Sequence, residues 1–101
     1  MERRYNIEYL PIAAQDLTEI IDYIKIDDPQ AAMKLLDDID DSISKLELFS
    51  HMGAVPKDLR LQSLGYRMLI IESYLVFYIV MDDIVEIHRI ISGKRKYSFL
   101  L

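Results

Sequence analysis

The chain has 101 residues, of which 51% are hydrophobic and 29% charged, and these values are typical of a single globular domain spanning residues 1–101. It contains no cysteine, which excludes disulfide bonds and thiolate metal sites. A net charge of −5 argues against general binding to polyanions. Residues 1–56 carry five Lys/Arg against twelve Asp/Glu, whereas residues 57–101 carry seven against five. The basic groups therefore form a local patch in an acidic protein.

Apolar runs in the chain are short. The longest, Tyr74–Met81, has the size of a strand and falls well below the roughly 18 residues that a membrane-spanning helix needs. Pro11 and Asp16 interrupt the segment that follows the N-terminal arginines, so a signal peptide is not predicted. We expect a soluble, unsecreted, cytoplasmic protein that does not contact membranes.

The first half of the chain predicts a strand followed by two helices. Tyr5–Leu10 alternates loosely and ends at Pro11, which is typical of a short strand. Asp28 and Pro29 suit the N-cap and first turn of a second helix, whose apolar stripe continues to about Phe49. The apolar positions at helical spacing are Ala13, Leu17, Ile20, Ile21 and Ile24, and then Ala32, Leu35, Leu36, Ile39, Ile43 and Leu46. The short connection between the helices predicts an antiparallel hairpin.

The second half predicts a loop over residues 54–65 and then an antiparallel meander. The strands are expected over Tyr66–Ile71, Tyr74–Met81 and Ile84–Ile91, with turns at Glu72–Ser73 and Asp82–Asp83. The middle strand is almost entirely apolar, which indicates a central strand covered on both faces. The predicted fold is α+β, in the order strand–helix–helix–strand–strand–strand, with the helical hairpin packed on a mostly antiparallel sheet.

His88 is the candidate for acid–base chemistry. If Glu86 lies on the same face of the last strand, its carboxylate could hold the imidazole in place for proton transfer. The alternative is a half-buried strand histidine with an ordinary hydrogen-bond partner, and the sequence leaves both open. His51 follows a helix end and is interpreted as structural.

Four aspartates on the second helix raise the question of a metal site. Asp37, Asp38, Asp40 and Asp41 diverge around the helix axis, whereas chelation requires oxygens to converge within about 2.0–2.6 Å of one ion. A solvated face is predicted, and neither a metal nor a cofactor is expected. Phosphate-binding glycine loops are excluded because the chain has only three glycines, at positions 53, 65 and 93.

Basic and tyrosine side chains alternate along the second half. The set comprises Arg60, Arg67, Arg89, Lys94, Arg95 and Lys96, interleaved with Tyr66, Tyr74, Tyr78 and Tyr97. Such residues can bind phosphates and stack on bases, can bind an acidic peptide, or can simply keep the protein soluble.

Several short segments follow one another in a recognisable order. They are Tyr9–Pro11 with Asp16–Leu17 and Tyr23–Ile24, Asp28–Pro29 with Phe49 and Gly53, Gly65–Leu69, Tyr74–Tyr78 with Asp82–Asp83, and Arg89–Arg95. Together they resemble the RelE/ParE superfamily of toxins over nearly the whole chain. The resemblance implies a growth-inhibiting bacterial toxin of a type II toxin–antitoxin module, neutralised by a cognate antitoxin, and it allows a higher toxin–antitoxin hetero-oligomer.

The resemblance implies different targets for different branches of the superfamily. ParE-like members poison DNA gyrase, and RelE-like members cut messenger RNA on the ribosome. A third reading is an inactive relative that only binds an antitoxin. A nuclease would draw its catalytic groups from Arg67, His88, Arg95 and Tyr97, and target binding would use Arg67, Arg89, Lys94, Arg95 and Lys96.

The sequence departs from the nuclease branch at two strands. Tyr66–Ile71 carries one basic residue where the nucleases tend to carry several, and Leu75 stands where they carry arginine. The acidic pI of about 4.9 also disfavours binding to ribosomal RNA. The ParE-like reading, a gyrase inhibitor rather than an enzyme, is therefore preferred.

Overall fold

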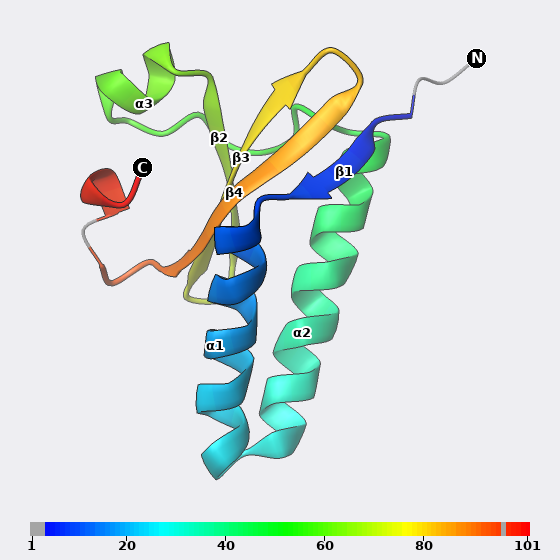
Figure 1. Ribbon diagram of the computed structural model, residues 1–101, viewed down its shortest axis with the longest axis vertical. Helices are drawn as coiled ribbons and strands as arrows, with labels where there is room; N and C mark the ends of the chain where they lie inside the picture. The colour runs from blue at the N-terminus through cyan, green and yellow to red at the C-terminus, as the bar shows by residue number, and fades with distance from the viewer. Residues whose placement is uncertain (1–3, 96) are drawn as a thin grey trace.

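A helical hairpin packed against a four-stranded sheet forms the two layers of the protein (Figure 1). The computed structural model describes residues 4–95 and 97–101. The elements are β1 (Asn6–Tyr9), α1 (Pro11–Asp27), α2 (Pro29–Ser44), the 3₁₀ turn η1 (Lys45–Glu47), α3 (Leu59–Ser63), β2 (Tyr66–Ile71), β3 (Tyr74–Met81), β4 (Ile84–Ser92) and the 3₁₀ turn η2 (Tyr97–Phe99). The predicted α+β fold and its element order are confirmed.

A single residue, Asp28, separates the two long helices. Its side-chain oxygen accepts a hydrogen bond from the backbone N–H of Ala31 at 3.0 Å, and Pro29 occupies the first turn of α2, as predicted. Figure 1 shows α1 and α2 side by side, with their connection far from the sheet. The chain tightens into η1 after Ser44, so α2 ends earlier than the predicted Phe49, although Leu46 in η1 remains buried.

The sheet has the order β1–β4–β3–β2, with β1 parallel to β4 and the other pairs antiparallel. Both predicted two-residue turns are present. They place Glu72 and Asp82 at φ values of 55° and 49°, in the left-handed region that such turns require. β3 is an inner strand with Leu75, Val76, Phe77 and Tyr78 buried, which confirms the central strand predicted from its apolar run.

The core occupies both faces of the sheet. On the hairpin face, Ala13, Leu35, Ile39 and Ile43 pack with Leu69, Val76, Tyr78, Ile87 and Ile90. On the opposite face, here called the far face, Leu61, Tyr66, Leu75, Phe77 and Ile91 pack with Tyr97, Leu100 and Leu101. The C-terminal segment and α3 therefore cover the side of the sheet that the hairpin leaves open.

Helix α3 lies where a loop over residues 54–65 was predicted. Asp58 caps it, with its Oδ1 accepting from the N–H groups of Arg60 at 2.9 Å and Leu61 at 3.1 Å. Five residues are too few for helical periodicity to be visible in the sequence. Burial of Leu61 on the far face stabilises this short turn of helix.

A β-bulge interrupts the pairing of β3 with β4. Tyr78 pairs with Ile87, but the preceding Phe77 pairs with Arg89, so His88 is an extra residue on β4. Ahead of the bulge, Tyr66, Ile79 and Glu86 are aligned across β2, β3 and β4 and share the far face. The bulge thus places His88 and Arg89 in the middle of the β3–β4 ladder, just beyond the point where the pairing of β1 with β4 ends at Ile87.

Tyr78 holds the loop after η1 against the sheet. Its hydroxyl oxygen accepts a hydrogen bond from the backbone N–H of Gly53 at 3.0 Å, and its side chain is fully buried. A Cβ atom on Gly53 would lie 2.6 Å from that oxygen and 2.9 Å from the carbonyl oxygen of Met68. Glycine is therefore needed for the close approach.

We expect Tyr78→Phe to lower the free energy of unfolding by about 1–2 kcal/mol, because the buried Gly53 N–H loses its acceptor. Denaturant unfolding followed by circular dichroism measures the effect. Tyr23→Phe is the control, since the Tyr23 side chain is 76% exposed. Equal unfolding midpoints for the two variants would show that the hydrogen bond contributes nothing.

Candidate target-binding site at the end of the sheet

The predicted basic end follows β4 in a tight turn. Gly93 donates its N–H to the carbonyl oxygen of Ser73 at 2.7 Å, and a Cβ atom on Gly93 would lie only 3.2 Å from that oxygen. The N–H of Arg95 then bonds the carbonyl oxygen of Ser92 at 3.1 Å. This turn displays Lys94 and Arg95 in exposed positions beside the β2–β3 turn.

A shallow groove of about 230 Å³ lies beside Arg95. Its walls come from α1 and from the ends of β3 and β4, and are formed by Asp16, Glu19, Ile20, Tyr23, Tyr74, Ile90, Ile91, Ser92 and Arg95. Within residues 4–95 and 97–101, the side chains of Lys94 and Arg95 form no ion pair or hydrogen bond. Both cations are therefore available to a partner, and tyrosine and arginine are the residue types that most often dominate protein interfaces.

Arg89, by contrast, is engaged within the fold. Its Nε donates to Asp16 Oδ2 at 2.8 Å and its Nη2 to Asp16 Oδ1 at 2.9 Å, a bidentate pair with side chains only 15% and 11% exposed. Its Nη1 donates to the carbonyl oxygen of Leu100 at 3.2 Å. The hydrogen bond to Asp16 raises the pKa of Arg89, against the opposing effect of burial. The structure thus places this predicted target-binding residue in a clamp between α1, β4 and the C-terminal segment.

Arg67 also has partners inside the protein. Its Nη1 donates to the carbonyl oxygens of His51 at 3.1 Å and Gly53 at 2.9 Å. These bonds connect β2 to the loop around Gly53, which also donates a hydrogen bond to Tyr78. Arg67 lies on β2 and Arg95 in the turn after β4, and the structure does not bring the two together in one groove.

His88 lies between two partners on the far face. Its Nε2 is 2.7 Å from Glu86 Oε1, and its Nδ1 is 2.9 Å from the hydroxyl of Tyr66. Glu86 and His88 therefore share a face, as the proton-transfer reading required. His51 contacts Ser50, with its Nδ1 3.1 Å from the hydroxyl oxygen.

The remaining predicted residues lie around the C-terminal segment. The ring of Tyr97 packs against Phe77 with ring centroids 5.0 Å apart, on the far face and away from the Arg95 groove. Lys96 lies outside the described residues. The predicted basic residues that the structure describes are thus dispersed over β2, β4 and the turn after β4.

Asp16 was not selected from the sequence as a functional residue, and Tyr66 was named only among the tyrosines that could stack on bases. Asp16 precedes its partner Arg89 by 73 positions, and Tyr66 precedes His88 by 22. Pairings of this range depend on strand register, which local periodicity does not reveal. The alternation within β4 was the only usable signal, and it linked Glu86 to His88.

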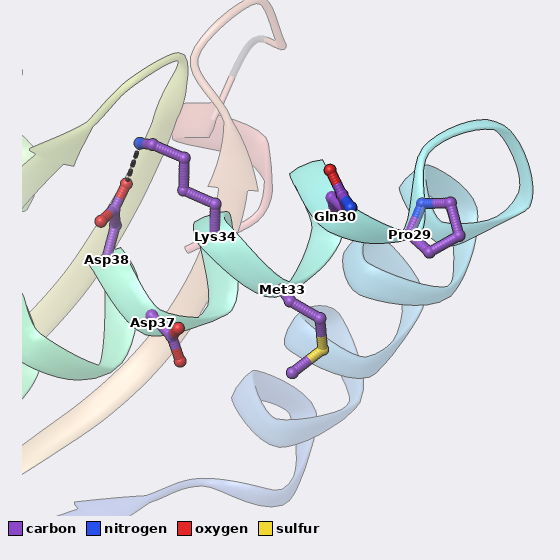
Figure 2. Close-up of a pocket in the computed structure, with 6 residues that line it drawn as sticks. All are labelled: Pro29, Gln30, Met33, Lys34, Asp37 and Asp38. Atoms are coloured by element: carbon purple, nitrogen blue, oxygen red, sulfur yellow. Dashed lines mark hydrogen bonds and ion pairs between the residues drawn. The ribbon is translucent and has the colours of Figure 1, made fainter.

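A second shallow hollow of about 530 Å³ runs along α2 (Figure 2) and is lined by Pro29, Gln30, Met33, Lys34, Asp37 and Asp38. Figure 2 shows Lys34 reaching Asp38, at 2.8 Å, while Met33 and Asp37 point away from that pair. All six residues belong to one helix, so this hollow lacks groups converging from other elements. Across the described parts of the chain, no cluster of three or more His, Asp or Glu side chains could hold a metal ion.

Comparison with known proteins identifies structures with a similar fold and the family of this chain. Eleven chains of solved structures match, among them one from "Chromosomal ParDE TA system from P. aeruginosa", with a TM-score of 0.73, 24% identity, and coverage of 89% of this chain and 97% of that one. The family described as "ParE toxin of type II toxin-antitoxin system, parDE" matches residues 7–97. The chain therefore belongs to the ParE toxin family, which confirms the resemblance stated above.

Two further findings accompany this assignment. A comparison with curated proteins finds no match. None of the helices in residues 4–95 and 97–101 is long and apolar enough to cross a membrane.

We expect Arg89→Lys to lower the free energy of unfolding by about 1.5–3 kcal/mol, because an ammonium group cannot reproduce the bidentate bond to Asp16. Thermal and denaturant unfolding measure the loss. Arg4→Lys serves as the control, since its ion pair with Glu47 is long, at 3.4 Å, and exposed. A loss no larger than that of the control would contradict the clamp.

Proposed function

We propose that the protein is a growth-inhibiting toxin that is neutralised by a cognate antitoxin and that inhibits DNA gyrase. The observation that supports this proposal is the distribution of basic side chains between buried and exposed positions. Arg67 and Arg89 on the strands are engaged inside the fold, whereas Lys94 and Arg95 at the end of β4 are exposed and free of partners within the described residues.

This distribution supports gyrase over messenger RNA as the target. Cleavage of RNA requires several cations around one phosphate. The guanidinium of Arg89 could contact a phosphate only by leaving Asp16, and the Asp16 carboxylate would then be buried without a partner. The two exposed cations of the β4 turn, beside the tyrosines of the Arg95 groove, suit contact with an acidic protein surface instead. We infer that this turn and groove meet the target.

The helical hairpin offers a surface for the antitoxin. Ile12, Tyr23 and Ile26 on α1 are 45%, 76% and 80% exposed, so the hairpin leaves large apolar side chains in solvent. Residues 11–44 carry two Lys/Arg against nine Asp/Glu. The complementary partner is an amphipathic helix whose apolar side chains cover α1 and whose lysines or arginines meet the surrounding carboxylates. We infer that the antitoxin supplies this helix.

Arg95→Ala should reduce gyrase inhibition at least about tenfold, because it removes the free guanidinium while leaving the Arg89 clamp intact. Purified protein is tested for trapping of gyrase–DNA cleavage complexes and for growth arrest on induction, with Arg4→Ala as the exposed-arginine control. Antitoxin binding should persist in the variant. A wild-type protein that cuts messenger RNA in a translation extract and leaves gyrase unaffected would identify the nuclease alternative, and one that does not arrest growth would identify an inactive relative.

Ile26→Asp should weaken antitoxin binding at least about tenfold, because it places a carboxylate within the apolar surface of α1. The partner in the assay is the protein encoded by the adjacent reading frame, and calorimetry measures its Kd. Leu59→Asp on α3 is the matched control, with Leu59 78% exposed against 80% for Ile26. Equal affinities for both variants would place the antitoxin elsewhere.

A further inference from the structure

The far face carries a hydrogen-bonded chain that the proposed function does not use. Tyr66 on β2 reaches His88 Nδ1 at 2.9 Å, and His88 Nε2 reaches Glu86 Oε1 at 2.7 Å. With one proton on the neutral imidazole, Nε2–H donates to Glu86 and Nδ1 accepts from the Tyr66 hydroxyl. The order is that of a nucleophile, a base and a group that orients the base.

We propose that Tyr66, His88 and Glu86 form an acyl-transfer site in which Tyr66 attacks small neutral esters. His88 is the general base, and Glu86 is the positioning residue that fixes its tautomer. This site is separate from the Arg95 groove and does not depend on the gyrase proposal.

The fold explains how these three side chains meet. Tyr66, Ile79 and Glu86 are aligned across three strands, so the side chains of Tyr66 and Glu86 emerge on the same face. The bulge adds His88 between them. The rings of Tyr66 and His88 are perpendicular, with centroids 5.2 Å apart, and the hydroxyl of Tyr66 lies 2.9 Å from His88 Nδ1.

A groove of about 220 Å³ opens beside Tyr66 and His88, and its lining indicates the class of substrate. Its walls are Leu10, Ile12, Tyr66, His88, Arg89, Leu100 and Leu101. Four of the seven are aliphatic, and the charge of Arg89 is already matched by Asp16. A groove of this size is smaller than the roughly 300–1,000 Å³ of drug-sized sites, so it suits a short uncharged acyl ester rather than a phosphate.

The reaction balances without a further reagent. The Tyr66 oxygen bonds to the carbonyl carbon of the ester, the bond from that carbon to the leaving oxygen breaks, and the phenol proton passes to His88 Nδ1. The leaving alkoxide or phenoxide departs, Glu86 stabilises the imidazolium, and the protein keeps an acyl group on Tyr66. His88 then returns its proton to solvent.

The surroundings make Tyr66 dependent on its base. Burial raises the pKa of the Tyr66 phenol, Arg60 opposes this rise, and Glu86 adds to it. The phenol therefore stays protonated near neutral pH and reacts only when His88 accepts the proton. Tyr23, which is 76% exposed and whose side chain forms no hydrogen bond within the described residues, provides a reference within the same molecule.

The test uses p-nitrophenyl acetate on the intact protein. Release of nitrophenolate reports the rate, and peptide mass spectrometry locates the acetyl group. Tyr66 should be acetylated at least about tenfold faster than Tyr23, since a positioned general base contributes factors of about 100 or more. Acetylation of Tyr66 at or below the rate of Tyr23 would overturn the proposal.

Variants separate chemistry from structure. Tyr66→Phe should abolish the rapid phase, His88→Gln should slow it at least about tenfold, and Glu86→Gln should slow it less, because the amide keeps a hydrogen bond without the charge. His51→Gln is the matched control, because the His51 side chain contacts Ser50 in a different part of the fold. Unchanged rates in His88→Gln with an unchanged melting temperature would exclude His88 as the base.

A pH profile distinguishes base catalysis from altered packing. Because the neutral imidazole of His88 accepts the phenol proton, Tyr66 acetylation should rise with pH and then reach a plateau, whereas acetylation of Tyr23, which has no positioned base, should show no plateau over the same range. The charged groups around His88 are Glu86 and Arg89 on β4, Arg60 on α3 and Glu8 on β1, which pairs with Glu86. Parallel profiles for the two tyrosines would contradict the role of His88.

Discussion

The pair formed by Arg89 and Asp16 joins three segments that are far apart in the chain. Asp16 lies near the start of α1, Arg89 follows the bulge of β4, and the same guanidinium holds the carbonyl oxygen of Leu100. Asp16 also accepts the backbone N–H of Ile90 at 3.0 Å, so its carboxylate continues the pairing of β4 beyond the end of β1. Because neither charge tolerates burial alone, the hairpin, the sheet edge and the C-terminal segment must assemble together.

This pair also determines where positive charge remains available. The acidic hairpin and its surroundings neutralise the cations within reach, as Arg89 with Asp16, Lys34 with Asp38 and Glu72, and Arg4 with Glu47 demonstrate. The number of basic residues in the second half of the sequence is therefore larger than the number that a partner can reach, because Arg67 and Arg89 are engaged inside the fold. At the end of the sheet, the short turn that carries Lys94 and Arg95 stays exposed without a described partner, directly after a strand whose position the clamp fixes. A protein surface is a better match for so small a patch than a nucleic acid, which binds through many phosphate contacts.

The features predictable from sequence are those with local causes. Asp28 with Pro29 predicts the helix boundary, Asp82–Asp83 predicts a two-residue turn, and the apolar run of β3 predicts burial on both faces. Helix α3 escaped prediction because five residues show no period. The partners of Arg67 and Arg89 escaped it for a different reason, since they depend on strand register and on which end of α1 meets β4. For the candidate site, alternation in β4 was enough to associate Glu86 with His88, but Tyr66 joins them only through the sheet.

One inserted residue on β4 connects the stability of the fold with both candidate sites. In a regular strand, His88 and Arg89 would point to opposite faces, whereas the bulge lets His88 reach Tyr66 while Arg89 turns to Asp16 and Leu100. The clamp then forms a shared wall: Asp16 lines the Arg95 groove, and Arg89 lines the groove beside Tyr66. The Arg89–Asp16 ion pair therefore separates the two grooves. A ligand in either groove could bind Asp16 or Arg89 only by breaking that pair, which would disturb the wall of the other groove. The ion pair therefore keeps the proposed interface, which follows β4, chemically independent of the proposed acyl-transfer site, whose Tyr66 lies on β2.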